Sequence, residues 1–298
     1  MTKDTAKEYE ASLKSLETEN YLDRWFYRPV GFRIARALRG TGITPNAVTI
    51  ISIFVGAVAG PLFYYDNICL ILLGILSLIL ANILDCVDGQ LARLTGVKSE
   101  IGRILDGFAG DVWFLFIYIF LALRMNREYD TRLFFIPAVL SAISHLVQAN
   151  ITDYYKTVHL YFISPAKGSE LQSSGEVRRQ YSRMKPGVNK MFVFFYKGYT
   201  ALQESVTPRL QRLLAEVKSE NNGIPTGECS LRFRHESNRL MKQWIDWLTF
   251  NGRAIALFIS VLSGIVWLYF FIEIVVLNFV LLKSIRQHEK ICDELIKK

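Results

Sequence analysis

The chain has 298 residues, of which 51% are apolar and 21% charged, and 35 lysines and arginines against 27 acidic residues give a net charge of +8. The apolar residues gather in long runs, whereas those of soluble domains are spread along the chain. This composition excludes a disordered tail, a disulfide scaffold and a soluble nucleic-acid binder, and it leaves a polytopic membrane protein with basic faces.

Residues 1–41 are predicted to form a cytoplasmic N-terminus that ends in an amphipathic helix. The first 20 residues are polar and lack the apolar core of a signal peptide, so we expect no cleavage there. Between 21 and 41, apolar side chains alternate with arginines at helical spacing, which is typical of a helix lying in the membrane interface. The residues of this pattern are Phe32, Ala35 and Leu38, beside Arg33, Arg36 and Arg39. A plain juxtamembrane linker is the alternative.

Six apolar segments predict an all-α, polytopic fold, because a helix needs about 20 apolar residues to cross a bilayer. The predicted spans are 47–65, 68–84, about 104–124, about 132–151, about 245–264 and 266–284. The last two come from one long run that Gly264 interrupts, and a single tilted helix there is the alternative. Residues 42–298 then form one membrane domain, with a soluble insertion at about 155–243 between the fourth and fifth spans.

Basic residues predict the orientation of these spans, since lysine and arginine favour the cytoplasmic loops. The segment before the first span, the turn after the second, the region after the fourth and the C-terminal tail are all basic. One loop opposes this assignment, because Arg124, Arg127 and Arg132 would lie outside. Four basic segments outweigh one, so we expect a multi-pass protein with both termini in the cytoplasm.

Three acids near the end of the second span are the strongest candidates for chemistry, since charges in membrane segments are costly. Asp85 and Asp88 are three residues apart and share a helix face, and Asp106 begins the next span, where it can face them. Converging carboxylates repel one another and stay ionised only with cations between them. Oxygen ligands of this kind select Mg²⁺, Mn²⁺ or Ca²⁺ over zinc.

The residues around these acids suit a phosphorylated ligand. Gly89 and Ala92 leave the helix surface open for a base or a phosphate, and Arg93 lies at the edge of the same face as a planar phosphate donor. The whole pattern, DxxDGxxAR and then GxxxD after eight residues, resembles the signature of the CDP-alcohol phosphotransferase (CDP-alcohol phosphatidyltransferase) family. The segment TPNAVT at 44–49 is similar to a TPNxxT segment found in many prokaryotic members.

The resemblance implies an integral membrane enzyme that binds a CDP-linked alcohol and an acceptor alcohol among membrane lipid, commonly as a homodimer and with two divalent ions, Mg²⁺ or Mn²⁺. No nucleic-acid partner is expected. Carried over residue by residue, the resemblance implies that the metal ligands are Asp85, Asp88 and Asp106. It also implies that the CMP pocket is shaped by Gly89, Ala92 and Gly102, and that Arg93 faces the phosphates.

One position departs from the family pattern. The fourth acid, the family's general base and a metal ligand, should stand at Gly110, but the acid follows at Asp111. On a straight helix residue 110 lies about 40° from Asp106 and residue 111 about 140° away. A π-bulge beside Gly107 and Gly110 would return Asp111 to the site, and on that basis we predict Asp111 as a catalytic residue and fourth ligand. The alternatives are a site of three acids and an inactive scaffold.

Other polar residues near the membrane edge give weaker signals. Asn46 and Thr49 either cap the first span or contact the cytidine. Arg253, at the start of the fifth span, either binds substrate phosphate or extends to the membrane interface. His145 in the fourth span is more typical of a satisfied bundle residue than of a ligand.

The resemblance also implies a reaction, in which an acceptor hydroxyl attacks the β-phosphorus of the CDP-linked substrate and CMP leaves. The N-terminal segments WFYRPVGFRI and TGITPN look most like prokaryotic branches with inositol-type acceptors. We therefore expect phosphatidyl transfer from CDP-diacylglycerol to such an acceptor, in the inner (plasma) membrane of a bacterium. Transfer of a polar head group from a CDP-alcohol to a lipid hydroxyl is the alternative.

Overall fold

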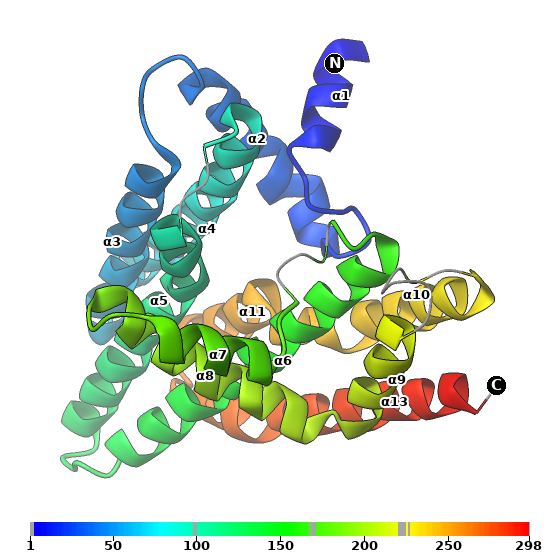
Figure 1. Cartoon of the computed structure of the whole chain (residues 1–298). Coiled ribbons are helices and arrows are strands. Elements are labelled where there is room, and N and C mark those ends of the chain that lie inside the picture. Colours follow the sequence, from blue (N-terminus) through cyan, green and yellow to red (C-terminus); the bar gives the residue numbers. More distant parts are fainter. Residues whose placement is uncertain are drawn as a thin grey trace. The chain divides into compact units, whose positions relative to one another are not determined.

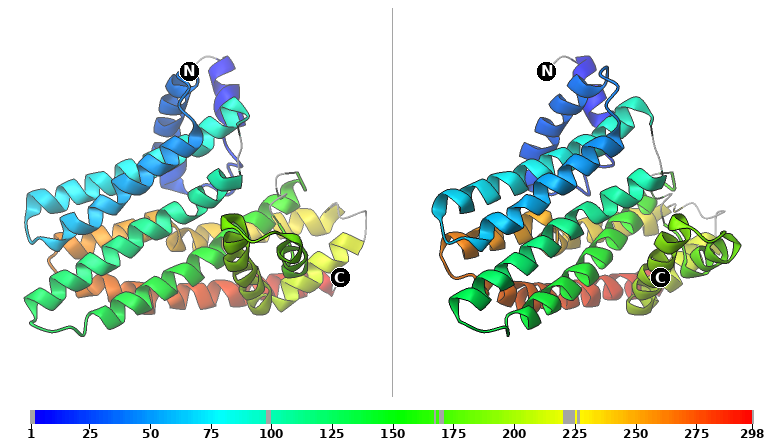
Figure 2. Two further views of the ribbon diagram at one scale, coloured as in Figure 1. Left: turned by 60° about the vertical axis from the view of Figure 1, so that its left-hand side comes forward. Right: turned by 90° about the vertical axis from the view of Figure 1, so that its left-hand side faces the viewer.

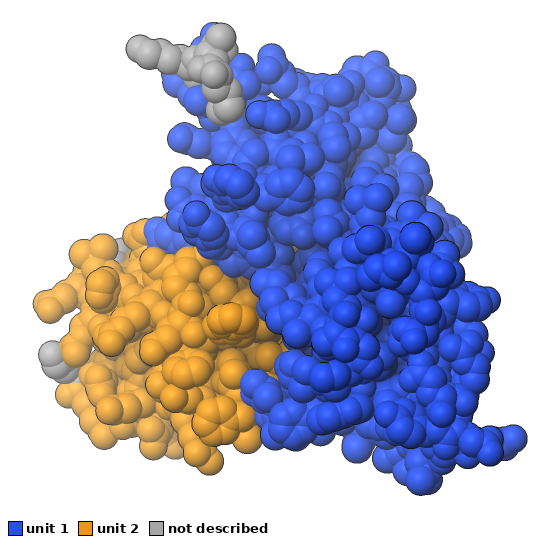
Figure 3. All heavy atoms as spheres, turned by 180° about the vertical axis from the view of Figure 1, so that it is seen from behind, with its two compact units in different colours: residues 1–146, 250–276 blue, residues 147–249, 277–298 orange. Residues whose placement is uncertain are grey.

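The structure is a computed structural model that describes residues 3–97, 100–166, 168, 171–219, 225 and 227–297. Every regular element in this part of the chain is a helix (Figure 1), which confirms the predicted all-α fold. The chain divides into two compact units, coloured separately in Figure 3. The first comprises Met1–Leu146 and Phe250–Val276, and the second Val147–Thr249 and Leu277–Lys298.

Among the described residues, five helical segments are long and apolar enough to cross a membrane. They are α3 (Pro45–Tyr64), α4 (Ile68–Thr95), the part Leu105–Glu128 of α5 (Glu100–Glu128), α6 (Phe135–Ile163) and the continuous helix Trp267–Ile296. Ile50, Phe54 and Val58 are exposed at four-residue spacing along one side of α3, as lipid-facing side chains are. The chain is therefore an integral membrane protein.

The predicted last two spans are separate helices, which excludes the single tilted helix. α11 (Phe250–Leu262) ends before Gly264, whose φ of 73° lies in the left-handed region that favours glycine and turns the chain. The sixth predicted span, 266–284, lies in the helix Trp267–Ile296, which continues beyond the predicted end. This helix is made of α12 (Trp267–Phe271), the π-helix η4 (Ile272–Val276) and α13 (Leu277–Ile296). The fifth prediction, 245–264, was too long, because α11 has only 13 residues and a separate 3₁₀ turn, η3 (Ile245–Leu248), precedes it.

Small residues hold the membrane helices of the first unit close together. α3 packs along both α4 and α5, as Figure 2 shows. A Cβ added at Gly56 on α3 would lie 2.3 Å from Cδ1 of Trp113 on α5, so only glycine allows this approach. Thr44 caps α3 by accepting a hydrogen bond from the Ala47 amide, with Pro45 in the first helical position.

The N-terminal segment of this unit contains α1 (Lys3–Ala11), the π-helix η1 (Asp23–Tyr27) and α2 (Arg28–Leu38). The predicted amphipathic pattern is present in α2, where Phe32 and Ala35 are buried and Arg33 is exposed. The buried side packs on α4, however, so these apolar residues face protein. Burial raises the pKa of Tyr27 to about 12, and its hydroxyl bonds Asn82 of α4.

The basic loop that opposed the predicted orientation has local partners for its charges. Arg124 is buried and bonds the carboxylates of Asp66 and Glu128, each at 2.7 Å. Arg127 lies 4.4 Å above the ring of Tyr64. These arginines fasten α5 to the α3–α4 turn, so their position has a structural reason that is independent of topology.

The second unit contains the rest of α6 and several shorter helices. These are α7 (Ser174–Arg183), α8 (Val188–Val206), α9 (Pro208–Ser219) and α10 (Gly227–Gln243), followed by η3 and α13. α6 continues to Ile163, past the predicted start of the insertion at 155, and α7 to α10 fall within the predicted 155–243. The Glu289 carboxylate accepts hydrogen bonds from the amides of Arg209 and Leu210, which ties α13 to the start of α9.

Candidate metal and phosphate site

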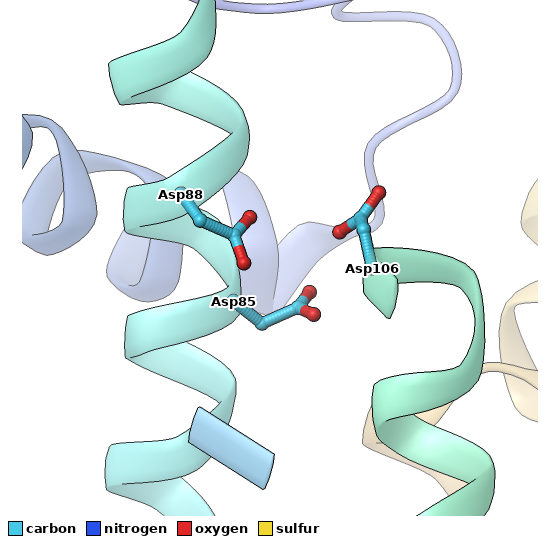
Figure 4. Close-up of side chains that lie close together, drawn as sticks. All are labelled: Asp85, Asp88 and Asp106. Carbon is cyan, nitrogen blue, oxygen red and sulfur yellow. The ribbon is translucent and has the colours of Figure 1, made fainter. Parts of the chain in front are cut away.

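Three carboxylates meet between α4 and α5. Asp85 and Asp88 project from one side of α4 toward Asp106 on α5, as Figure 4 shows. One carboxylate oxygen from each lies within 4.8 Å of the others. The spacing of three residues explains the first pair, because residues i and i+3 share a helix face. The structure thus brings together the three acids that the sequence singled out.

The three acids differ in their access to solvent. Asp88 is buried, Asp85 half-buried and Asp106 exposed, so the group opens toward the side of Asp106. The Asp88 carboxylate lies beside the hydroxyl of Thr49, which also donates to the Pro45 carbonyl. Thr49 is therefore next to the site, whereas Thr44 and not Asn46 is the residue that caps α3.

The donor set fits a hard divalent cation. Three carboxylates so close repel one another unless positive charge lies between them. Within the described residues, the Oδ2 atom of Asp88 is buried and has no hydrogen-bond partner, a costly arrangement that a bound cation would relieve. Carboxylate oxygens alone, with no sulfur or imidazole, favour Mg²⁺, Mn²⁺ or Ca²⁺ over zinc.

Comparison with known proteins agrees with the motif. Residues 42–169 match the model of the CDP-alcohol phosphatidyltransferase family. The chain is 45% identical over 74 residues to the archaetidylinositol phosphate synthase of Pyrococcus horikoshii, which covers 25% of this chain and 38% of the relative. It is 33% identical over 64 residues to an uncharacterized protein of Aquifex aeolicus, covering 22% of this chain and 31% of the relative.

Residues 42–169 are therefore similar to the CDP-alcohol phosphatidyltransferase family. The match ends at residue 169, and the chain spans less than two fifths of the length of these two curated relatives. The three acids all lie inside the matched range, whereas the N-terminal segment, α11 and the helix Trp267–Ile296 lie outside it.

The family motif is laid out around the acids on α4. A Cβ added at Gly89 would lie 3.1 Å from Nη2 of Arg93, so the glycine lets the Arg93 guanidinium lie against the helix. Ala92 is half-buried on the same helix, and Gly102 is near the start of α5. Arg93 donates from Nε to the carbonyl oxygen of Ser12 in the N-terminal segment.

The bulge that we predicted at the family's fourth acid is absent. α5 is a regular α-helix from Glu100 to Glu128, so Asp111 stays turned away from Asp106, and it is not in the group of three acids. Gly107 and Gly110 border open space, since a Cβ added at either position meets no atom within 4 Å. The Asp111 Oδ1 atom lies instead 3.3 Å from Nε2 of His145 on α6.

His145 links Asp111 to the hydroxyl of Tyr118 inside the first unit. Its Nδ1 atom is 3.0 Å from the Tyr118 hydroxyl, and the Tyr118 ring stacks on Tyr269 at 5.8 Å. His145 is thus a satisfied residue of the helix bundle, as expected from the sequence. The geometry favours the alternative of a three-acid site, with Asp111 packed elsewhere.

Arg253 lies at the start of α11, where the sequence placed it, but it is buried inside the protein. Its guanidinium is buried and forms an ion pair with Glu273, whose side chain is fully buried. A phosphate of the substrate would have to displace this carboxylate, so the structure assigns Arg253 to packing. One sequence signal points to this pair: Glu273 is a lone acid inside the apolar run at 254–282, and such an acid needs a buried partner.

Proposed function

We propose that this protein is a metal-dependent CDP-alcohol phosphotransferase of phospholipid synthesis. The observation that carries the proposal is the group of three carboxylates at the family motif, with the buried Asp88 oxygen that needs a cation. Asp85, Asp88 and Asp106 would hold the divalent ions. When bound, such ions neutralise the charge of a pyrophosphate and favour attack on its phosphorus.

The reaction that we propose is the one that the family resemblance implies. The acceptor hydroxyl oxygen forms a bond to the β-phosphorus, the bond between that phosphorus and the bridging oxygen breaks, and CMP leaves. Asp106, the exposed carboxylate, can take the hydroxyl proton, while Arg93 binds phosphoryl oxygens. Gly89, Ala92 and Gly102 leave room for the nucleotide.

For the substrates we propose a lipid linked to CDP and an inositol-type acceptor. The relative from Pyrococcus horikoshii supports this choice, since its name identifies it as an archaetidylinositol phosphate synthase. Head-group transfer from a CDP-alcohol to a lipid hydroxyl is the competing reaction. We also propose a homodimer in the plasma membrane with both termini in the cytoplasm. The local ion pairs of Arg124 give a structural reason for the basic residue that opposed this orientation.

One assay panel tests the reaction. Purified protein in lipid nanodiscs receives CDP-diacylglycerol or CDP-archaeol with inositol, inositol phosphate, glycerol phosphate or serine, and in separate arms CDP-choline with diacylglycerol. We expect CMP and an inositol-type phospholipid by mass spectrometry, complete loss with EDTA and recovery with Mg²⁺ or Mn²⁺. A folded protein that releases no CMP from any pair would instead support the inactive scaffold, which the missing acid at Gly110 favours.

A second prediction concerns Asp111. We expect Asp111→Asn to release CMP at nearly the wild-type rate, because asparagine keeps an oxygen acceptor next to His145 and Asp111 lies outside the group of acids. Asp106→Asn, the same chemical change on the same helix, is the matched comparison and should be inactive. An Asp111→Asn protein as inactive as Asp106→Asn would restore Asp111 to the catalytic site.

A third prediction adds the missing acid. A Cβ added at Gly110 would meet no atom within 4 Å, so Gly110→Asp fits without a clash. Gly110 is four residues after Asp106 and therefore lies on the same face of α5. A fourth carboxylate there would act as a general base, an effect of about 10²-fold or more in favourable sites. We expect faster CMP release by Gly110→Asp, measured at saturating Mg²⁺, and no gain in Gly107→Asp, the control on another side of α5.

A further inference from the structure

The N-terminal segment between Ser12 and Arg28 forms one wall of the candidate site, although it precedes the range that matches the family. Ser12 and Asn20 are buried. The Gln90 amide of α4 donates to the Ser12 hydroxyl and to the Arg28 carbonyl, each at 3.2 Å. These bonds join the segment to the helix that carries Asp85 and Asp88.

A second element outside the family range fixes the same wall. The Asn251 amide of α11 donates to Asn20 Oδ1 at 2.6 Å and to Asp23 Oδ1 at 2.9 Å. Asn20 Oδ1 also accepts the Asp23 amide, which holds the turn before η1. The segment is therefore attached on two sides, and its side chains have defined positions next to α4.

Two arginines are held in this wall through their Nε atoms. Arg28 donates from Nε to Glu19 at 3.0 Å, and Arg93 donates from Nε to the Ser12 carbonyl. Within the described residues, no hydrogen bond from the Nη atoms of either guanidinium to protein is seen. The Nη donors of two oriented guanidinium groups are thus available to a ligand.

The charges of both arginines act on the carboxylate group. Arg28 interacts electrostatically with Asp85 and with Arg93, and Arg93 interacts with Asp88 and Asp106. Divalent ions on the three acids would take up the negative charge of the carboxylates. Arg28 and Arg93 repel each other, and Glu19, which pairs with Arg28 and also acts on Arg93, offsets part of this repulsion. A bound anion would offset the rest.

We propose that Arg28 and Arg93 form a phosphoryl-binding site, in which Arg28 is a substrate-binding residue supplied by the N-terminal segment. The forked guanidinium matches the geometry of phosphoryl oxygens. The phosphoryl group comes either from the CDP-linked substrate or from a phosphorylated acceptor. This inference rests on the proposed function and adds to it a ligand-binding residue beyond residues 42–169.

The test must separate phosphate binding from folding. Arg28→Gln alone would leave Glu19 buried without its partner, which is destabilising in itself. The double variant Arg28→Gln/Glu19→Gln removes both charges and keeps the pair neutral. Arg33→Gln, an exposed arginine on the same helix, is the matched control.

Binding is measured by titration calorimetry on the full chain in nanodiscs with Mg²⁺, using CDP, CMP, inositol phosphate and inositol. If the phosphoryl group belongs to the donor, both Arg28 variants should bind CDP about tenfold more weakly or worse while CMP is unchanged, since charge-assisted bonds have this strength. If it belongs to the acceptor, the affinity for inositol phosphate should fall by a similar factor, and the affinity for inositol should be unchanged.

Two results would overturn the inference while the proposed function stands. One is wild-type affinity for all four probes in both Arg28 variants, as in Arg33→Gln. The other is recovery of affinity in the double variant, because the loss in Arg28→Gln would then come from the unpaired Glu19. A wild-type protein that binds neither nucleotide would instead contradict the proposed function.

Discussion

Asp88→Asn is expected to abolish CMP release, with a loss of more than about a hundredfold, the upper range for residues that only support a metal ligand. Asp88 is the buried member of the three acids, and its Oδ2 atom has no partner among the described residues. Asparagine has nearly the same shape but no charge, so it binds a divalent ion poorly. The measurement is CMP release at saturating Mg²⁺.

The control for this variant is Asp130→Asn, the same change at an exposed loop position. Asp130 has a left-handed φ of 45°, which asparagine also tolerates. The control should keep full activity. An Asp88→Asn protein with a tenth or more of the wild-type rate would contradict the metal site.

The same variant should not be less stable without metal. Removing one of three mutually repelling carboxylates lowers their repulsion, so the melting temperature of Asp88→Asn in EDTA should equal or exceed that of wild type. Addition of Mg²⁺ should then raise the melting temperature of wild type and leave that of Asp88→Asn unchanged. A wild-type protein that Mg²⁺ does not stabilise would argue against ion binding at these acids.

The part of the site that the sequence predicted is the local part. Asp85 and Asp88 share a helix face because of their spacing alone, and a short hairpin places Asp106 opposite them. Hydropathy predicted the long membrane helices for the same reason, because the apolar composition of a segment is a property of its local sequence alone. It misjudged α11, because an apolar run does not reveal that a 3₁₀ turn replaces its first residues.

The contacts that sequence reasoning missed join residues far apart in the chain. The Asn251 amide donates a hydrogen bond to Asn20, and Arg93 donates one to the carbonyl of Ser12. The hydrophobic periodicity of the sequence does not predict such contacts. The bulge expected at Asp111 is absent, because α5 is a regular helix there, and Gly107 and Gly110 border open space. Tertiary packing decides which helices lie next to one another, so these residue pairs cannot be predicted from local sequence.

Glu273→Gln is expected to destabilise the protein by about 3–5 kcal/mol, the cost of leaving one partner of a buried ion pair unpaired. Arg253 and Glu273 are both buried on apolar helices of the first unit, where no water can replace the lost carboxylate. The measurement is the thermal midpoint in detergent micelles. Lys290→Gln, which breaks an exposed pair with Glu294 at 3.8 Å, is the control and should shift it little.

The double variant Arg253→Gln/Glu273→Gln decides what Arg253 does. With both charges gone, the two amides can still hydrogen-bond each other, so much of the stability lost in Glu273→Gln should return. If Arg253 acts only in packing, as its buried pair indicates, the refolded double variant should release CMP at nearly the wild-type rate. A stable double variant that has lost CMP release would assign Arg253 to the substrate phosphate after all, because restored folding with lost turnover cannot come from the broken pair.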